Sequence, residues 1–176
     1  MSSRGPHVED PTQKPLALIG FMGSGKSVVG AIVAERARAP LFDLDLMIQD
    51  EAGKSITEIF ATGGEHAFRK LEARLLPSTL QPGAVVALGG GALINDASWT
   101  IVAGRAVTIY LEVPFETIWS RISKVSGRPL ASGRSHDDVE SLFERRRPRY
   151  EQALHRVDGD RPPAEVADEV IKLWSA

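Results

Sequence analysis

The stretch GFMGSGKS, at residues 20–27, decides the fold, because it fits the pattern G-x-x-x-x-G-K-[ST] of a phosphate-binding loop. It follows a short apolar run at residues 16–19 and precedes residues 26–38, whose apolar side chains recur at helical spacing. The motif requires a loop between a strand and a helix, since main-chain amides and the N-terminal end of the helix then surround a phosphate anion. The alternative is a glycine-rich turn that matches by chance. The spacing and the context together favour the phosphate loop.

Outside this loop, apolar runs alternate with helical patterns along the chain. Strands are predicted at residues 16–19, 41–42, 84–88 and 106–111. Short apolar strands that alternate with helices indicate βαβ units around a parallel sheet with helices on both faces. Such sheets bind ligands beyond the carboxyl ends of their strands. We therefore expect the segments that follow three of these strands, residues 20–27, 43–45 and 89–91, to converge on one cleft.

The predicted helices have start and stop signals of differing strength. Ser55 and Glu58 form a capping-box pattern at the start of a short helix, which two glycines end at residues 63–64. A further helix is expected over residues 65–76, with Pro77 as its stop. The remaining helices are expected from near Leu46 and over residues 115–122, 137–154 and 164–174.

The composition indicates one compact domain. The chain has 176 residues, 43% hydrophobic and 25% charged, and its net charge of −2 gives no overall positive field for nucleic acid or an acidic membrane. Cysteine is absent, which excludes disulfides, a thiol nucleophile and a thiolate metal site. No apolar stretch approaches the ~18 residues of a membrane span, and the polar N-terminus is not a secretory signal. We expect a cytoplasmic protein with a flexible tail at residues 1–14 and one domain at residues 15–176.

Each residue of the phosphate loop has a chemical task. The main chain at Gly23, Ser24 and Gly25 would surround the phosphates of a nucleotide. Lys26 would supply a cation for the β and γ oxygens, and the hydroxyl of Ser27 would ligate Mg²⁺. ATP and Mg²⁺ are therefore the expected ligands of this loop.

In phosphate-loop proteins, an Asp at the end of a later strand usually helps to hold the Mg²⁺ ion. This chain has no carboxylate at that position. The predicted strand at residues 84–88 ends without a carboxylate, so the acid must come from elsewhere. Asp43 is the candidate, because its strand should end beside the phosphate loop. The alternative is that Asp43 caps the next helix, a role for which Asp45 is also available. The need for a magnesium ligand favours the metal role.

Asp45 is the candidate for the acceptor side. It lies two residues beyond Asp43, so an extended segment would point both side chains the same way. One carboxylate could serve the metal while the other faces an acceptor hydroxyl, orients it and accepts its proton.

Two arginines could recognise a carboxylate on the acceptor. Arg69 lies on a helix with apolar neighbours, and Arg146 lies in the basic run at residues 145–147. On composition alone, both are ordinary solvated surface arginines. If both reached one pocket, their guanidinium groups would suit bidentate capture of a carboxylate.

The glycine run Gly89, Gly90 and Gly91 follows a buried strand. It could be a flexible turn. The entropic cost of three successive glycines instead suggests that something approaches the main chain closely. The sequence leaves both interpretations open.

A polar segment at residues 124–136 has the composition of a lid. Arg128 within it could swing onto the transferred phosphate as the lid closes and excludes water. The alternative is a surface loop with a solubilising arginine. Arg121, on the helix before this segment, could stack on adenine or be an ordinary exposed helical arginine.

From about Leu16 to Trp174, the chain resembles the shikimate kinase family. The phosphate loop alone is shared by many families, whereas the other matching segments, in this order, are much more specific. They are Asp43 with Asp45, GGEHAFR at residues 63–69, LGGGA at 88–92, GRPL at 127–130 and RRPRY at 146–150.

The resemblance implies ATP-dependent phosphorylation of the 3-hydroxyl of shikimate. It also implies a P-loop fold of the nucleoside-monophosphate-kinase type, a three-layer α/β structure with a five-stranded parallel sheet and a mobile lid. The implied roles are Asp45 as proposed base, Arg69 and Arg146 on the substrate carboxylate, Gly90 in the substrate loop, Arg128 on the phosphates, and Ser27 with Asp43 at the magnesium.

Three places depart from the family pattern. One is in the lid, where the chain has Leu130-Ala131 and the family commonly has a second apolar residue. Val28 stands where the family usually has Thr, so one phosphate contact would be lost. The late arginine on the adenine side has only a loose match in Arg161, within the compressed segment at residues 158–163. None of these changes removes a group that the chemistry needs.

Two other functions compete with shikimate phosphorylation. A kinase of another hydroxy acid, such as gluconate, could use the same arginines, although the glycine run and the Asp43 and Asp45 pair favour shikimate. A catalytically silent ligand-sensing module would usually adjoin a DNA-binding domain, and the 14-residue tail has no room for a helix-turn-helix. The retention of Lys26, Ser27, Asp45 and Arg128 together also argues against such a module. The expected partner is a small molecule, bound by a monomer without nucleic acid or membrane.

Overall fold

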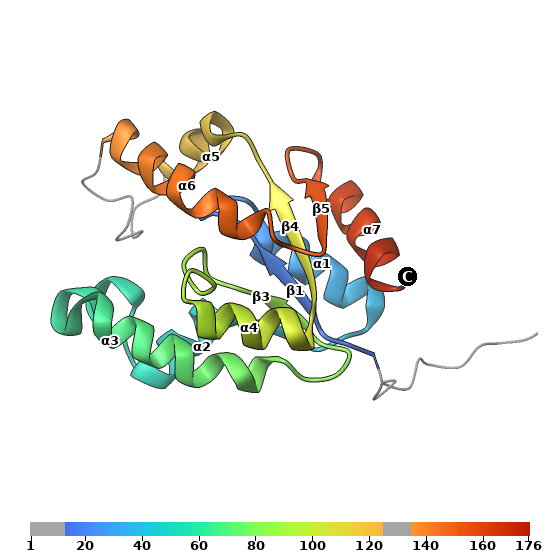
Figure 1. Ribbon diagram of the computed structural model, residues 1–176, viewed down its shortest axis with the longest axis horizontal. Helices are drawn as coiled ribbons and strands as arrows, with labels where there is room; N and C mark the ends of the chain where they lie inside the picture. The colour runs from blue at the N-terminus through green and yellow to red at the C-terminus, as the bar shows by residue number, and fades with distance from the viewer. Residues whose placement is uncertain (1–12, 125–134) are drawn as a thin grey trace, which may run out of the picture.

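The computed structural model describes residues 13–124 and 135–176 and has five parallel strands between two layers of helices (Figure 1). The order of the strands across the sheet is β2-β3-β1-β4-β5. This arrangement confirms the expected three-layer α/β fold of the P-loop kinases with a five-stranded parallel sheet. The elements are β1 (Leu16–Ile19), α1 (Lys26–Ala37), β2 (Leu41–Asp43), α2 (Leu44–Ala52), α3 (Ile56–Thr79), β3 (Val85–Ala87), α4 (Asp96–Arg105), β4 (Val107–Glu112), α5 (Phe115–Ile122), α6 (His136–Tyr150), β5 (His155–Asp158) and α7 (Pro163–Trp174).

The central strand β1 shows why both faces of the sheet are covered. Its four residues are at most 1% exposed, and their side chains alternate between two apolar clusters. Leu16 and Leu18 pack with α1 and α7, whereas Ala17 and Ile19 pack with α2 to α6 on the opposite face. A strand that is apolar on both sides can be stable only in the middle of such a sheet.

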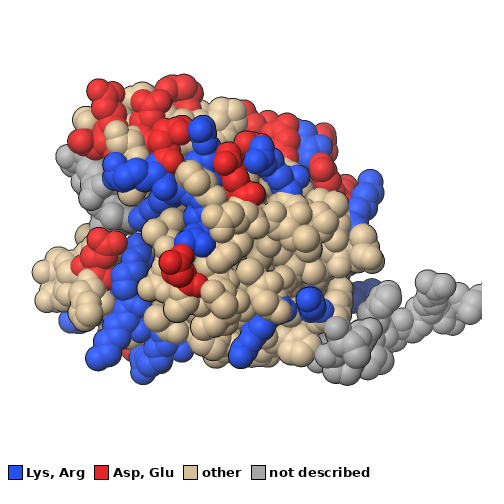
Figure 2. All heavy atoms as spheres, viewed as in Figure 1, with Lys and Arg blue, Asp and Glu red and all other residues tan. Residues whose placement is uncertain are grey.

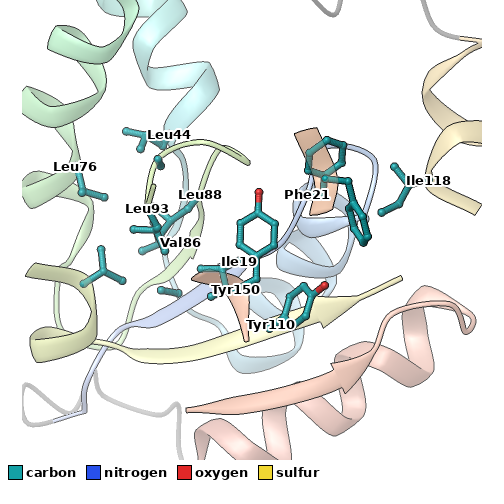
Figure 3. Close-up of a cluster of buried hydrophobic side chains, with 14 of the residues drawn as sticks. Ile19, Phe21, Leu44, Leu76, Val86, Leu88, Leu93, Tyr110, Ile118 and Tyr150 are labelled. Atoms are coloured by element: carbon teal, nitrogen blue, oxygen red, sulfur yellow. The ribbon is translucent and has the colours of Figure 1, made fainter. Parts of the chain in front are cut away.

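The larger cluster lies directly beneath the carboxyl ends of the strands. Figure 3 shows side chains of β1, β3 and β4 with those of the surrounding helices, among them Ile19, Leu88, Tyr110 and Tyr150. Each of these four residues is at most 2% exposed. Burying one such side chain contributes about 1.5–3 kcal/mol, so this cluster is a rigid base for the loops above it.

The strand order brings the three expected loop segments together. Strands β2, β3 and β1 are neighbours and run parallel, so their carboxyl ends lie at the same edge of the sheet. Asp43 ends β2, residues 89–91 follow β3, and the phosphate loop follows β1. The prediction of a single cleft at this edge is confirmed.

Helix α2 begins earlier than expected. It starts at Leu44 and not near Leu46, because Asp43 is its N-cap and accepts hydrogen bonds from the amides of Asp45 and Leu46 at 3.1 and 3.3 Å. The early start places Asp45 in the first turn of the helix, where its carboxylate interacts favourably with the helix dipole.

Helix α3 also departs from expectation. The break at Gly64, with φ of 68°, is present, but the second part continues beyond Pro77 to Thr79. The hydroxyls of Ser78 and Thr79 each donate to a carbonyl of the last turn, of Leu75 and Leu76, at 2.7 Å. These bonds satisfy carbonyls that the end of the helix would otherwise leave open. The helix thus extends two residues beyond Pro77, and the prediction that Pro77 stops it is wrong. Helix α6 likewise ends at Tyr150, four residues before the expected end.

The folded part of the chain includes residues 13 and 14, which were assigned to the tail. The carbonyl of Gln13 accepts from the Gly83 amide at 2.9 Å, and that of Lys14 accepts from the indole of Trp174 at 2.8 Å. Residues 1–12 of the expected tail and most of the expected lid lie outside the described residues. Over the described ranges, no helix combines the length and the apolar character needed to cross a membrane.

Helices α5 and α6 meet around His136. Its ring packs edge-on against Phe115 and Trp119 at centroid distances of 5.1 and 5.3 Å. Its Nε2 lies 3.0 Å from Glu116, and its Nδ1 lies 3.3 Å from Asp137 and 3.9 Å from Glu140. The hydrogen bonds to Glu116 and Asp137 raise the pKa of His136 above its ordinary value of 6.5.

This contact predicts a pH-dependent stability. A raised folded pKa means that His136 stabilises the fold fully below pH 6.5 and that the contribution is lost as pH rises through the folded pKa. We expect the wild type to melt at a higher temperature than His136→Asn under acidic conditions, with the difference shrinking towards alkaline pH. Thermal melts from pH 5.5 to 9 test this, with His66→Asn on the exposed face of α3 as control. A difference that does not change with pH would contradict the prediction.

Candidate active site

The cavity at the end of β1 has the shape of a nucleotide site. It encloses about 490 Å³ and is lined by the phosphate loop together with Asp43, Asp45 and the predicted adenine-side arginines. Gly23 and Gly25 have φ of 79° and 93°, a left-handed conformation that other residues rarely adopt. This conformation turns the loop around the start of α1, whose first amides are free of intrahelical partners.

Lys26 lies at the centre of this loop. Its side chain is 9% exposed, and its ammonium donates to the carbonyls of Gly20 and Phe21 at 2.8 Å. A third contact, to the hydroxyl of Ser24, is 3.4 Å long. The cation is therefore held inside the loop, close to where the phosphates of a nucleotide would lie.

The two predicted magnesium ligands contact each other directly. The Ser27 hydroxyl donates to Asp43 Oδ2 at 2.7 Å, while Asp43 Oδ1 caps α2. The cap at Oδ1 confirms one interpretation of Asp43, and the metal role stays a prediction for which Oδ2 is suitably placed. A hydroxyl and a carboxylate oxygen side by side in the nucleotide cavity are hard donors of the kind that Mg²⁺ prefers, so these residues fit the ion.

Arg121 and Arg161 line the far side of the nucleotide cavity. Arg121 donates to the Gly23 carbonyl at 3.1 Å and pairs with Asp160 at 3.3 Å. Arg161 pairs with Glu169 and donates to the Asp158 carbonyl. Both are placed where an adenine-side contact is expected. Val28, 55% exposed, adds an apolar side chain to the same cavity.

A second cavity of about 300 Å³ lies between α2, α3, α6 and the glycine run. It contains all the predicted acceptor-side residues: Asp45, Arg69, Gly89, Gly90, Gly91 and Arg146. Its remaining wall is partly apolar, formed by Met22, Ile56, Phe60 and Phe68. Charged groups on one side and apolar carbon on the other suit a small, carbon-rich acid with hydroxyl groups.

The two arginines are not surface residues. The side chain of Arg69 is 27% exposed and pairs with Glu72 at 2.7 Å and Glu65 at 3.3 Å. Arg146 is 7% exposed and lies over the Phe21 ring at 5.9 Å. The hypothesis that both reach one pocket therefore agrees with the geometry, and the interpretation as solvated charges does not.

Burial affects the charged groups of this cavity unequally. Burial lowers the pKa of Arg146, whereas the pKa of Arg69 is raised because its two glutamate partners outweigh its burial. Burial raises the pKa of Glu72, against the opposing effect of Arg69. Within the described part of the chain, Arg146 Nη1 and Glu72 Oε1 are buried without a hydrogen-bond partner. The cationic donor of Arg146 and the carboxylate acceptor of Glu72 are therefore both available to a ligand in this cavity.

Asp45 connects the two cavities, since it lines both of them together with Met22, Gly89 and Gly90. From the side shown in Figure 2, Lys and Arg side chains gather between α3 and α6, while Asp and Glu side chains gather along the edge over α5 and α6. An anionic ligand would therefore be attracted to the region of the acceptor cavity.

The glycine run is explained by close approaches of the protein to its own main chain. A β-carbon on Gly89 would lie 2.6 Å from Asp45 Oδ1, and one on Gly90 would lie 3.0 Å from the amide nitrogen of Met22. A β-carbon on Gly91 would collide with the guanidinium of Arg69. Each glycine thus makes room for a different part of the site, which favours close approach over a flexible turn.

Gly89→Ala is expected to lower kcat by about 10²-fold, because the new methyl group must displace the Asp45 carboxylate and a shift of about 1 Å is costly in catalysis. The affinity for ATP should change much less. Steady-state kinetics with both substrates measure this. Gly104→Ala on α4 is the control, since a β-carbon there meets nothing within 4 Å. A kcat near that of the control would mean that Asp45 need not stay in its present position.

No site role was predicted from the sequence for several residues that line the acceptor cavity. The sequence position of Glu72 could have indicated its role, because Glu72 follows Arg69 by three residues, the spacing of an ion pair on a helix. From the sequence pattern, Phe60 and Phe68 are typical of core residues on an amphipathic helix. Arg128, predicted to contact the phosphates, lies outside the described residues.

Comparison with known proteins places this site in a family context. The family model described as shikimate kinase matches residues 22–174. A shikimate kinase of Salinibacter ruber is 39% identical over 170 residues, which cover 90% of this chain and 83% of the relative. A solved structure of a shikimate kinase from Acinetobacter baumannii in complex with shikimate has a TM-score of 0.88 and 28% identity, and the match covers 93% of each chain.

More distant structures share only the fold. A gluconokinase from Sinorhizobium meliloti has a TM-score of 0.60 and 17% identity, with 93% of this chain and 92% of that chain covered. At this identity the likeness extends to the sheet and its helices and carries no statement about the acceptor.

Proposed function

The chain belongs to the shikimate kinase family, and we propose that it transfers the γ-phosphoryl group of ATP to the 3-hydroxyl of shikimate. The observation that carries this proposal is the position of Asp45, which lines the nucleotide cavity and the acceptor cavity together. An alcohol in the second cavity would meet a phosphate in the first beside one carboxylate.

On the nucleotide side, the phosphate loop binds the phosphates of ATP through main-chain amides and Lys26. Ser27 and Asp43 would hold Mg²⁺, which neutralises phosphate charge when it is bound. The remaining work of this side is positioning, because phosphoryl transfer needs little covalent chemistry from the protein.

On the acceptor side, Arg69 and Arg146 bind the carboxylate of shikimate and so fix the orientation of its ring. The apolar wall formed by Phe60 and Phe68 packs against the ring carbons. Asp45 accepts a hydrogen bond from the 3-hydroxyl and takes its proton as the new bond to phosphorus forms. The bond to the β-phosphate oxygen breaks, and ADP leaves with shikimate 3-phosphate as the second product.

Assays with purified protein, ATP and Mg²⁺ test this function. Formation of ADP should require shikimate, and mass spectrometry should identify shikimate 3-phosphate. Gluconate in place of shikimate should give no more ADP than a reaction without acceptor. Turnover with gluconate and none with shikimate would overturn the proposal, and no turnover with any acceptor would favour a silent ligand-sensing module.

We further propose that the enzyme acts as a monomer in the cytoplasm, where ATP is available. The phosphate loop, Asp45 and both arginines come from one chain, so the reaction needs no second copy. Light scattering during size-exclusion chromatography tests the first point, and fractionation of cells tests the second.

A further inference from the structure

Tyr150 lies directly behind the acceptor cavity without lining it. It is the last residue of α6 and is 2% exposed. Its hydroxyl donates a hydrogen bond to the carbonyl of Gly90, the middle residue of the glycine run. Figure 3 shows this hydroxyl pointing away from Tyr110, whose ring packs against Tyr150 at a centroid distance of 5.6 Å.

Arg146 lies one helical turn before Tyr150 on α6, so both buried side chains lie on the same face of the helix. Burial raises the pKa of the Tyr150 hydroxyl, and the nearby positive charge of Arg146 opposes that rise. The hydrogen bond to Gly90 therefore fixes the end of α6, and Arg146 with it, against the glycine run.

The helix end that Tyr150 anchors presents a buried guanidinium group to the acceptor cavity. Arg146 is 7% exposed and lies over the Phe21 ring at 5.9 Å. Its Nη1 is buried and lacks a hydrogen-bond partner among the described residues. This nitrogen keeps its place beside the acceptor as long as α6 stays fixed to the Gly90 loop.

We infer that Tyr150 is a positioning residue for the carboxylate of shikimate, because its hydroxyl ties the end of α6, with Arg146 one turn away, to the Gly90 loop of the acceptor cavity. The inference rests on the proposed function. Tyr150 does not touch the substrate and acts through Arg146. Its loss should therefore weaken recognition of the carboxylate without weakening recognition of the nucleotide.

Tyr150→Phe tests this inference, because it removes the hydroxyl and keeps the ring in the core. We expect the KM for shikimate to rise about tenfold, as for the loss of one buried hydrogen bond, and the KM for ATP to stay within about twofold. Tyr110→Phe is the matched control, since that ring adjoins Tyr150 but lines a separate hollow with Glu112 and Glu144. It should change neither KM.

Shikimate methyl ester distinguishes a loss of Arg146 positioning from general damage to the acceptor cavity. The ester lacks the negative charge, so its KM should change by less than about threefold in Tyr150→Phe. In the double variant with Arg146→Lys, Tyr150→Phe should cause no further rise in the KM for shikimate. An equal rise for shikimate and its ester, an equal rise for ATP, or additivity with Arg146→Lys would overturn the inference. Absence of shikimate turnover in the wild type would instead overturn the proposed function.

Discussion

Asp45→Asn is expected to lower kcat for shikimate phosphorylation by about 10²–10⁴-fold and to leave the affinity for ATP nearly unchanged. Asparagine has the shape of aspartate and can still accept a hydrogen bond, but it cannot take up the proton of the acceptor hydroxyl. Asp45 is in the first turn of α2 and packs against Gly89, so the substituted side chain should keep its place. The loss would then be one of chemistry and not of geometry.

Steady-state kinetics and calorimetric titration with a non-hydrolysable ATP analogue measure the two quantities. Asp50→Asn is the control, since Asp50 lies on the exposed face of the same helix. A kcat within about tenfold of the wild type would mean that Asp45 orients the hydroxyl and that the proton leaves by another route. The pH–rate profile separates the two cases further, because the acidic limb of kcat should disappear from the variant if Asp45 is the base.

The strands beneath this site could be predicted from the sequence because each is buried on both faces. Residues 16–19 and 84–88 are apolar runs bounded by turn residues, a pattern that few other structures satisfy. The phosphate loop follows one of these strands, and its position therefore indicates the edge of the sheet at which ligands bind. Most of the site's position follows from these two facts, since parallel neighbours end at one edge.

Strand β5 and helix α4 carried no comparable signal. In β5, with the sequence HRVD, Val157 is the one buried residue, because the strand is at the edge of the sheet. In α4, with the sequence DASWTIVAGR, the buried residues are Ser98 and Val102. Neither segment has the periodic apolar pattern from which an element is predicted, and tertiary contacts decide their structure.

The two arginines show a different limit of prediction. Local sequence gives Arg69 and Arg146 the appearance of surface residues, and they become candidate ligands because two helices far apart in the chain bring them to one cavity. The family resemblance indicated this convergence before composition could. Asp43 illustrates a third case, in which the two interpretations do not exclude each other, because one carboxylate oxygen caps α2 and the other faces Ser27, where a metal ligand is predicted.

Arg69→Ala is expected to raise the KM for shikimate by about 10- to 150-fold, because the carboxylate loses a charged partner. The KM for ATP should change little, since Arg69 does not line the nucleotide cavity. The ion pair adds a second consequence. Glu72 has a side chain only 5% exposed and is paired with Arg69 at 2.7 Å, so removing the arginine leaves a buried carboxylate without its cation.

The free energy of unfolding of Arg69→Ala should therefore fall by roughly 2–4 kcal/mol at pH 7, somewhat less than for a fully buried pair because Arg69 keeps some exposure. Without Arg69, the pKa of Glu72 rises further above its ordinary value of 4.5. A protonated Glu72 is neutral, so the deficit should shrink as pH falls through this raised pKa and be largest at alkaline pH. Urea unfolding at several pH values measures it.

The double variant Arg69→Ala with Glu72→Gln distinguishes the two roles of Arg69. A neutral amide at position 72 needs no cation, so the double variant should regain most of the lost stability. It should not regain affinity for shikimate, because the guanidinium is still absent. Arg74→Ala is the control on the same helix, where the pair with Glu51 is solvent-exposed and should contribute about 0–1 kcal/mol. If stability and the KM for shikimate recovered together, the effect of Arg69 on shikimate would be structural, and the carboxylate would depend on Arg146 alone.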